Sequence, residues 1–325
     1  MSRYARQAML PEVGPSGQAR LRAARVLVVG AGGLGAPVLP YLAGAGVGAI
    51  TIVDPDRVEL SNLHRQTLFR TADLGLPKAV AAQATLAALN PEITLRAEVR
   101  ALDPASADAL LSGQDLVLDC ADSFAASYVA SDACRDRGLP LISASALGLS
   151  GYAGGFCGGA PSLRAVFPDL PDRGATCASA GVLGPVVGVI GAVQAQMALS
   201  VLLGLAPSSL GQMVTFDAAT WRMSGFRFDT APEPAAGLRF VAPSQIRVED
   251  LAVDLRQPEE GPLVVPWALR IAPQDIDADR LGLAPGQRLV LCCQSGLRAW
   301  RAGRALQDRL SNEIVLAALA EEIPR

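Results

Sequence analysis

The stretch that decides the fold is Arg25–Gln66, which reads RVLVVGAGGLGAPVLPYLAGAGVGAITIVDPDRVELSNLHRQ. A short apolar run ends at Gly30, and an Ala-, Gly- and Leu-rich stretch leads from there to a second apolar run, Ala49–Val53, which Asp54 follows. Short apolar runs bounded by glycine favour buried strands, and the stretch between them has a helical pattern. The order of strand, helix and strand predicts a βαβ unit.

Four glycines lie at the turn between the first strand and the helix. Gly30, Gly32 and Gly35 have the GxGxxG spacing, and Gly33 falls between them. This spacing allows a tight turn, close approach of the backbone to phosphate and close packing of helix on sheet. Phosphate would bind at the N-terminus of the following helix, and Asp54 lies where an acidic residue usually holds ribose hydroxyls. The alternative is a Gly-rich packing turn in a chain with 32 glycines; the order of elements favours a nucleotide site without saying which nucleotide.

Length, charge and cysteine content limit the class of protein. The 325 residues suggest two domains, and a formal net charge of -3 without any basic run argues against a nucleic-acid binder. The N-terminal residues MSRYARQAML lack the apolar core and cleavage pattern of a signal peptide, so we expect a cytoplasmic protein. The 6 cysteines include no CxxC pair, and we expect reduced thiols. The expected partner is a small molecule or another protein.

One lysine stands out in a chain that otherwise uses arginine. Lysine and arginine together number 28, and Lys78 is the only lysine. Lysine is a compact point charge and arginine a planar fork, so a site crowded against phosphate can require lysine. The alternative is a solvated lysine at the start of an Ala-rich helix. His64 is the only histidine, which excludes a His-based metal cluster or a His pair.

The alternation of strands and helices continues downstream. The expected helices begin near Pro77 and Ser123, and the expected strands cover residues 93–99, 115–120 and 140–147. Asp122 lies just past the carboxyl end of the second of these strands. Open α/β sheets bind their ligands at this end. We therefore predict an α/β fold with a doubly wound, Rossmann-like sheet.

The region Gly174–Phe216 contains no Asp, Glu, Lys or Arg. Within it, residues 181–206 form a stretch that is long and apolar enough for a transmembrane helix, which needs about 20 residues. Gln194 and Gln196 in the middle, and the lack of a basic flank, argue against a membrane span. Glycines at helical spacing would let another helix approach closely, so we expect a buried core or dimer helix.

The composition changes after this region. Residues 229–243, DTAPEPAAGLRFVAP, are rich in Pro, Ala and Gly and mark a domain boundary. We assign residues 1–228 to the nucleotide-binding domain, 229–239 to a linker and 240–325 to a small second α/β domain. The expected pieces of the second domain are a strand ending in VDLR, a strand RLVLCC, a loop QSGLR and a helix over residues 299–310.

Five motifs together resemble the MoeB/ThiF/HesA family, relatives of the ubiquitin-activating enzymes: GAGGLG, IVDPDRVELSNLHRQ, GLPKA, LDCADSF and GVLGPVVGVIGAVQA. The resemblance covers nearly all of residues 1–225, and SNLxRQ after the IVDPD strand is its most specific part. It implies a ubiquitin-activating-enzyme-like fold that binds ATP with Mg2+ and adenylates the C-terminal glycine of a ubiquitin-like sulfur-carrier protein ending in Gly-Gly. In this reaction a carboxylate attacks the α-phosphate of ATP, so it needs cations and positioning and no base.

The resemblance implies roles for individual residues. The glycine loop and Asp54 bind the nucleotide, Asp56 belongs to the same motif, and Asp122 is the magnesium-associated aspartate. Three residues surround the phosphates: Asn62, Arg65 and Lys78. In relatives the second Arg of RYxRQ enters the partner's active site, so Arg6 would act in trans in an obligate homodimer. The alternatives are carboxylates that cap strand ends and loop side chains that form hydrogen bonds only within the chain.

Three departures from the family pattern matter. The family's TDNFxTRY reads ADSFAASY here, so Ser123 and Ser127 replace an Asn and an Arg, and one cation is lost. The first zinc CxxC of the family falls on Ser162 and Ala165 and the second on the cysteine-free linker, so we predict no zinc site. Cys177 lies where some relatives capture the activated carrier as a thioester or acyl disulfide; the alternative is a buried inert thiol.

The C-terminal part, about residues 240–325, resembles a rhodanese domain. VDLRQPEE matches the family's DVRxPEE, and CQSGLR matches its CxxGxR active loop. The resemblance implies that Cys293 carries a persulfide, with backbone N–H groups and Arg298 stabilising the thiolate. The adjacent Cys292 is expected to point to the other face of the strand. The usual terminal segment is replaced by IVLAALAEE, and a purely structural appendage is the alternative to sulfur transfer.

Three hypotheses for function follow. The first is an ATP-dependent adenylyltransferase that activates a sulfur carrier for molybdopterin, thiamine or tRNA thiolation, with the C-terminal domain as persulfide donor. The second is a catalytically weakened scaffold that binds the carrier. The third is an NAD-dependent oxidoreductase, which nothing downstream of the glycine motif supports.

Overall fold

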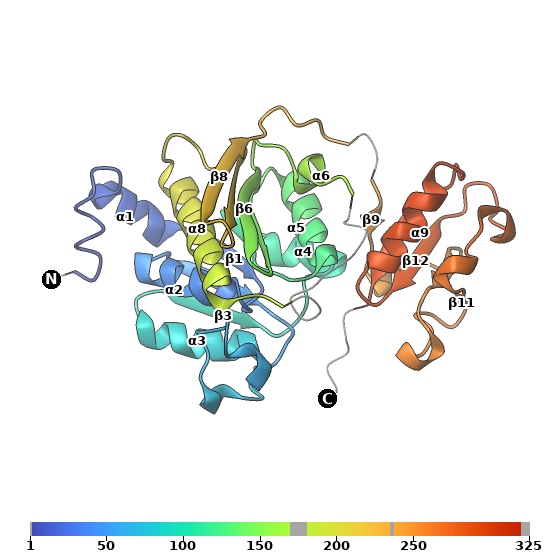
Figure 1. Ribbon diagram of the computed structural model, residues 1–325, viewed down its shortest axis with the longest axis horizontal. Coiled ribbons are helices and arrows are strands. Elements are labelled where there is room, and N and C mark those ends of the chain that lie inside the picture. The colour runs from blue at the N-terminus through green and yellow to red at the C-terminus, as the bar shows by residue number, and fades with distance from the viewer. Residues whose placement is uncertain (1, 170–180, 235–236, 320–325) are drawn as a thin grey trace.

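The structure, a computed structural model, describes residues 2–169, 181–234 and 237–319. This part of the chain contains an 8-stranded sheet and a 5-stranded sheet. Figure 1 shows the two sheets in separate bodies, with the smaller one beside helices α4 (Pro104–Leu111) and α5 (Phe124–Arg137) of the larger. Helix α1 (Gly14–Ala23) lies at the opposite end of the molecule.

The large sheet begins as a doubly wound parallel sheet, as predicted. Its strand order is β3-β2-β1-β4-β5-β6-β7-β8, and the first five strands of this order run parallel to one another. Their bounds are β1 Arg25–Val29, β2 Ala49–Val53, β3 Thr94–Glu98, β4 Leu116–Asp119 and β5 Pro140–Leu147. The order reverses between β1 and β4, and open α/β sheets bind ligands beyond the carboxyl ends of the strands at such a point.

Helices cover both faces of the parallel strands. One core contains α2 (Gly35–Ala45), α3 (Lys78–Leu89) and α8 (Gly184–Leu203), and the core on the other face contains α4 and α5. Successive side chains of β1 enter these two cores in alternation. Strands buried on both faces have nearly continuous apolar sequences, which explains why the first strand reads RVLVV.

Helix α8 is the charge-free helix expected within residues 181–206. It has 20 residues and a mean hydropathy of 2.0, so by length and composition it could cross a membrane. Half of its most apolar window is buried inside the fold, and it packs against α2, β5 and β6 (Ser150–Cys157). Gln194 in the middle of the helix is fully buried and donates hydrogen bonds to two strand carbonyls, those of Asp119 and Ile142. In this structure α8 is a core helix of the α/β fold.

Three antiparallel strands extend the sheet beyond β5. They are β6, β7 (Gln212–Asp217) and β8 (Arg222–Arg227). The sequence patterns do not predict them, because the glycines and small polar residues of SGYAGGFC and RMSGFR hide the alternation. All residues of the outermost strand, β8, are exposed.

The small domain contains five parallel strands in the order β11-β10-β12-β13-β9. Their bounds are β9 Arg239–Phe240, β10 Leu251–Asp254, β11 Leu269–Arg270, β12 Leu289–Cys293 and β13 Ile314–Ala318. Helix α9 (Leu297–Gln307) packs on β12 and β13 and begins two residues before the predicted helix, at 297 instead of 299. The segment IVLAALAEE was not predicted as a strand, yet its first five residues form β13 in the interior of the sheet.

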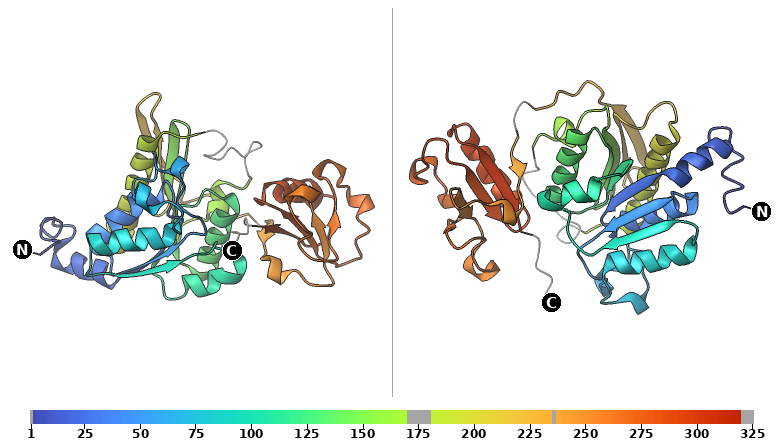
Figure 2. Two further views of the ribbon diagram at one scale, coloured as in Figure 1. Left: turned by 90° about the horizontal axis from the view of Figure 1, so that it is seen from below. Right: turned by 180° about the vertical axis from the view of Figure 1, so that it is seen from behind.

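The two domains share an apolar core. The core on the α5 face of the large sheet continues through Tyr128 into Trp300 of α9, and the two ring centroids lie 5.2 Å apart. Figure 2 shows, from two further directions, the small domain placed against the α4 and α5 side of the large one. The helical surface that closes the large sheet on this side therefore also carries the small domain.

Candidate functional site

The predicted nucleotide site lies at one edge of the large sheet. Strand β1 pairs in register with both β2 and β4. The residues that follow these strands, Gly30, Asp54 and Cys120, therefore meet at the carboxyl edge, where the strand order reverses. Helix α2 begins at Gly35, so its free N–H groups face the loop that joins it to β1.

Two of the predicted glycines are required by backbone packing alone. A β-carbon on Gly35 would lie 2.3 Å from the carbonyl oxygen of Gly30, and one on Gly30 would lie 2.6 Å from that of Cys120. Gly30 also has φ +95°, in the left-handed region that favours glycine. The turn therefore brings α2 close to the strand ends.

Asp54 is buried and ties β2 to the glycine loop. One carboxylate oxygen accepts a hydrogen bond from the N–H of Ala31 at 2.7 Å, and the other accepts from the N–H of Asp56 at 2.8 Å. Burial raises the pKa of the Asp54 carboxyl to about 6, against the opposing effects of Lys78 and the two N–H groups. Its protonation therefore changes close to neutral pH.

Lys78 begins α3 and reaches the same edge. Its side chain is 8 % exposed, and its ammonium lies 2.8 Å from the carboxylate of Asp56, whose side chain is 59 % exposed. Lys78 is therefore not the solvated lysine of the alternative reading. It is a buried positive charge with one exposed acidic partner, which an anionic ligand could replace.

The SNLHRQ segment covers the glycine loop. A β-carbon on Gly33 would lie 3.8 Å from the aliphatic part of Arg65, and one on Gly32 would lie 3.5 Å from Nε2 of Gln66. The guanidinium of Arg65 donates to the carbonyl of Ser61 at 3.2 Å. Arg65 has no acidic partner among the residues that the structure describes, so its charge is available to a ligand.

Two buried carboxamides of this segment lack partners. Asn62 and Gln66 are 8 % and 3 % exposed, and the side-chain oxygen of each has no hydrogen-bond partner in the described part of the chain. A buried polar atom without a partner is costly, so both side chains are candidates to bind a ligand. Gln66 was not among the predicted site residues, although it is the last residue of the motif that carries the resemblance.

Asp122 is exposed in the turn between β4 and α5. The turn is held by Asp119, a fully buried carboxylate that accepts hydrogen bonds from the hydroxyl of Ser143 at 2.7 Å and the N–H of Ala121 at 3.2 Å. Burial raises the pKa of Asp119, and these hydrogen bonds lower it. Sequence reasoning missed Asp119 because it reads as the last residue of a buried strand.

The first turn of α5 contains the two serines that replace an Asn and an Arg of the family pattern. The hydroxyl of Ser127 donates to the carbonyl of Ser123 at 3.3 Å, within the helix itself. Neither side chain extends a positive charge toward Asp122. The cationic side chains that the structure brings to this edge are Arg65 and Lys78.

The roles predicted for two residues are not tested by the structure. Arg6 is exposed in the N-terminal segment, and the structure records no hydrogen bond or ion pair between it and the other candidate residues that it describes. Cys177 lies outside the described residues. The prediction that Arg6 acts on a partner's site therefore stays a prediction, as does the role of Cys177.

The second group of predicted residues lies at the end of β12. Cys293 is fully buried, and the N–H of Ala299 in α9 donates to its sulfur at 3.4 Å. Arg298 forms a two-point ion pair with Glu260, which lowers the pKa of that carboxyl to about 2. Cys292 points into the core on the opposite face, as predicted, and burial raises the pKa of its thiol to about 12.

Ser162, which aligns with a zinc-binding cysteine of the family, forms hydrogen bonds with an acidic residue of the linker. The N–H and hydroxyl of Ser162 donate to the two carboxylate oxygens of Glu233 at 2.6 and 2.7 Å. Arg135 of α5 lies 3.3 Å from the same carboxylate. These bonds fix the linker to the large domain, and Ala165 contributes no ligand atom.

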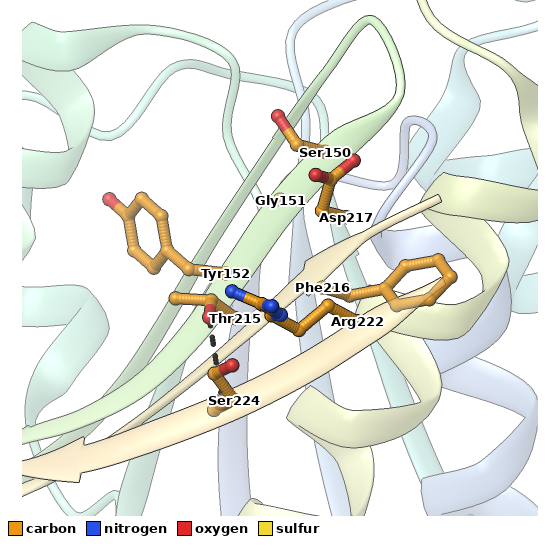
Figure 3. Close-up of a pocket in the computed structure, with 8 residues that line it drawn as sticks. All are labelled: Ser150, Gly151, Tyr152, Thr215, Phe216, Asp217, Arg222 and Ser224. Carbon is orange, nitrogen blue, oxygen red and sulfur yellow. Dashed lines mark hydrogen bonds between the residues drawn. The ribbon is translucent and has the colours of Figure 1, made fainter. Parts of the chain in front are cut away.

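A hollow of about 310 Å³ lies elsewhere, on the face of β6, β7 and β8. Figure 3 shows its lining side chains, among them Tyr152, Asp217 and Arg222. None of the predicted site residues lines it. The predicted site residues that the structure describes lie elsewhere, most of them at the carboxyl edge of the large sheet and others at the end of β12.

Three features define the class of a nucleotide-binding α/β protein. They are the edge of a doubly wound sheet, a glycine loop at a helix N-terminus and a buried carboxylate after the second strand. The ThiF family model matches residues 4–236. The chain therefore belongs to the ThiF family, and the family resemblance seen in its motifs is confirmed.

Several curated proteins are similar to this chain. It is 38 % identical over 240 residues to the SAMP-activating enzyme E1 of Haloferax volcanii, covering 73 % of this chain and 89 % of that protein. It is 44 % identical over 226 residues to the sulfur carrier protein adenylyltransferase of Thermus thermophilus, covering 67 % and 83 %. It is 48 % identical over 219 residues to the adenylyltransferase and sulfurtransferase MOCS3 of Bos taurus, covering 66 % of this chain and 48 % of MOCS3. The match thus spans about half the length of MOCS3.

Solved structures show the same fold. Escherichia coli MccB superposes with a TM-score of 0.64 at 22 % identity, covering 72 % of this chain and 71 % of MccB. PaaA superposes with a TM-score of 0.60 at 23 % identity, covering 70 % and 72 %. At this identity the likeness concerns the fold, and it confirms the Rossmann-like sheet.

Proposed function

We propose that this protein uses ATP to adenylate the C-terminal glycine of a ubiquitin-like sulfur-carrier protein. The observation that carries the proposal is a set of polar groups around the glycine loop. Arg65 and Gln66 lie over the loop. The charge of the buried Lys78 acts on Asp54, which accepts a hydrogen bond from the loop. The side-chain oxygens of Asn62 and Gln66 have no hydrogen-bond partner among the described residues. The names of the relatives agree with a nucleotidyltransferase, since those from Thermus thermophilus and Bos taurus are both called adenylyltransferases.

The chemistry is a displacement at the α-phosphorus of ATP. The C-terminal carboxylate of the carrier attacks, a new oxygen–phosphorus bond forms, and pyrophosphate leaves with the electron pair of the bond that breaks. Negative charge accumulates on the phosphates during this step, so fixed cations are the main protein contribution. Lys78 and Arg65 supply those cations, and the N-terminus of α2 supplies N–H groups.

The remaining residues bind and orient the nucleotide. Asp54 accepts hydrogen bonds from the ribose hydroxyls. The carboxamides of Asn62 and Gln66 bind polar atoms of the nucleotide over the glycine loop. Asp122 suits Mg2+, which is usually held by one or two carboxylates together with substrate phosphates, and the metal would neutralise phosphate charge. Asp119 positions the turn that carries Asp122, because its own oxygens are occupied by Ser143 and Ala121.

The small domain is proposed as a rhodanese-like sulfur donor. Its Cys293 thiolate attacks the outer sulfur of a donor such as thiosulfate, and sulfite leaves with the bonding electrons. The resulting persulfide attacks the acyl carbon of the adenylated carrier, and AMP leaves with the electron pair of the broken C–O bond. Arg298 lies next to Cys293 in space and contributes positive charge, and the pKa of its guanidinium is raised first by Glu260 and also by that thiol.

The test of the proposal is carrier-dependent exchange of pyrophosphate into ATP. The probe is the sulfur carrier protein of Thermus thermophilus, for which the relative in that organism is named, compared with the same carrier lacking its last residue. We expect exchange only with the intact C-terminus. Absence of exchange with the intact carrier, together with retained carrier binding, would favour the weakened scaffold, which the loss of the cation at Ser127 also favours.

Persulfide formation has a separate test. Thiosulfate treatment is expected to add one sulfur atom to the Cys293 peptide in mass spectra. The Cys292→Ala variant is the matched control and should gain the same mass, because Cys292 lies on the opposite face of the sheet. A Cys293 thiol that iodoacetamide alkylates but thiosulfate leaves unmodified would make the small domain a structural part of the protein without sulfur-transfer activity.

A further inference from the structure

The strand ends that carry Asp122 and Cys293 face each other across the domain interface. Helix α5 starts directly after the turn of Asp122, and α9 starts directly after the loop of Cys293. A β-carbon on Gly296, the residue before α9, would lie 3.4 Å from the β-carbon of Ala125 in the first turn of α5. Asp122 and Cys293 are each three residues from this contact, and three residues span at most about 10 Å of extended chain.

A cation–π cluster holds this arrangement. The guanidinium carbon of Arg164 lies 4.6 Å from the ring centroid of Tyr128 and 5.4 Å from that of Trp300. Asp132 of α5 accepts two hydrogen bonds from Arg164, at 2.6 and 2.8 Å. Tyr128 and Trp300 are 2 % and 3 % exposed, so the contact is desolvated, and cation–π contacts are strongest in that state.

Ion pairs surround the cluster and cross the same interface. Arg239 lies 3.4 Å from Asp136 of α5, and Arg304 of α9 lies 2.8 Å from Asp169. The linker is fixed through Glu233 to Ser162, as described above. The interface therefore has an apolar centre with a charged rim and a fixed connection, all within one polypeptide.

Cys293 is enclosed in the arrangement in which the small domain contacts α5. Cys293 is fully buried and belongs to the apolar core that contains Ala125, Tyr128 and Trp300. A soluble sulfur donor cannot reach a fully buried thiol. Sulfur must therefore be loaded while the small domain is away from α5.

We propose that the small domain serves the adenylation site of its own chain. The interface with α5 keeps the Cys293 loop beside the turn of Asp122, and release from α5 exposes the thiol for loading and for attack on the adenylated carrier. This inference rests on the adenylation and persulfide functions proposed above. Beyond those functions, it identifies the surface to which the Cys293 loop binds, which is α5 of the same polypeptide.

The interface is tested by the rate at which iodoacetamide alkylates Cys293 in the full-length protein, read by peptide mass spectrometry. Ala125→Arg places a bulky side chain against Gly296 and leaves every residue of the small domain in place. We expect alkylation of Cys293 to become at least tenfold faster. An unchanged rate would overturn the inference, whether or not the protein adenylates a carrier.

Trp300→Ala probes the same interface from the other side, and Trp267→Ala is its matched control because Trp267 is 40 % exposed in the same domain. We expect faster alkylation in Trp300→Ala only. Cys292 reports unfolding, because it lies in the core on the far face of the small sheet. If both cysteines of Trp300→Ala react, that domain has unfolded, and the Ala125→Arg result decides.

Delivery within one chain is tested by mixing two variants. Lys78→Met removes adenylation and Cys293→Ser removes sulfur loading, so neither chain alone transfers labelled thiosulfate sulfur to the Thermus thermophilus carrier. We expect no transfer from the mixture, although the Cys293→Ser chain still exchanges pyrophosphate. Restored transfer would overturn the inference, whereas a lack of exchange in every sample would instead refute the proposed function.

Discussion

Lys78 shows how one residue combines sequence and structural signals. It is the only lysine in the chain, and its buried ammonium contacts the exposed carboxylate of Asp56. Lys78→Met keeps the length of the side chain and removes its charge. We expect carrier-dependent exchange to fall about 100-fold, which is typical for loss of one group that stabilises transition-state charge.

The stability of this variant separates function from folding. Asp56 stays hydrated when its partner is removed, so the free energy of unfolding should change by less than about 1 kcal/mol. Arg57→Ala is the control, because Arg57 is an exposed cation next to Asp56. Equal loss of exchange in both variants would mean that overall charge at this edge matters and not the buried ammonium.

Asp54 gives the site a pH dependence. Its pKa is about 6, chiefly because it is buried, and ribose hydroxyls bind best to the ionised form. Affinity for ATP should be constant above pH 6 and should weaken as pH falls below it, by up to about tenfold per unit. Calorimetric titrations at pH 5 and pH 7.5 measure this change, and the same pH dependence in Asp54→Asn would contradict the assignment.

The raised pKa of Asp54 also affects the stability of the fold. Most carboxyl groups have a lowered pKa in the folded state and stabilise it as pH rises, and Asp54 does the opposite. The folded-state pKa of Asp54 lies above the ordinary value of 3.8, so the folded state binds more protons between 3.8 and about 6. The contribution of Asp54 to stability therefore falls as pH rises through this range. Burial without an adjacent ion pair makes this carboxylate costly to ionise.

At the level of elements, the glycine turn between β1 and α2 is the most constrained feature of the fold. In Gly35→Ala the new methyl group would lie 2.3 Å from the carbonyl oxygen of Gly30, so the backbone must shift. Overpacking of this kind typically costs about 1–3 kcal/mol. We expect a lower melting temperature and weaker nucleotide binding.

Gly44→Ala in the same helix is the matched control. Gly44 lies near the end of α2, and a β-carbon there would have nothing within 4 Å. Replacing an exposed helical glycine by alanine usually stabilises by about 0.5–1 kcal/mol. Thermal unfolding should therefore move in opposite directions for the two variants, and a parallel shift would refute the steric explanation.

The elements differ in how far sequence predicts them. The strands β1, β2, β4 and β5 and the helices α3 and α5 follow from apolar runs, Pro77 and turn residues, because those signals are local. The antiparallel strands β6–β8 and the strand β13 do not, because their pairing depends on neighbours distant in the sequence. Local propensity is weak there, and tertiary packing decides the outcome.

At the scale of the whole molecule, the predicted role of Arg6 requires a second copy of the chain. We expect light scattering to give a dimer and Arg6→Ala to lose exchange activity. A mixture of Arg6→Ala with Lys78→Met should recover about a quarter of wild-type exchange, because half of the dimers are mixed and each has one complete site. A monomeric mass, or no recovery in mixed dimers, would refute action in trans.

Short contiguous motifs were enough to predict the doubly wound fold, the family and most of the residues at the carboxyl edge, because glycine turns, parallel strands and their terminal carboxylates are local features of the chain. Burial and contacts between distant residues are not contained in those motifs and come from the folded structure. It buried Lys78 and Asp54, left the side-chain oxygens of Asn62 and Gln66 without a hydrogen-bond partner in the described part of the chain, and assigned Asp119 to hold the turn of Asp122. It also placed the Cys293 loop on α5, through contacts between residues more than a hundred positions apart that no local pattern can specify.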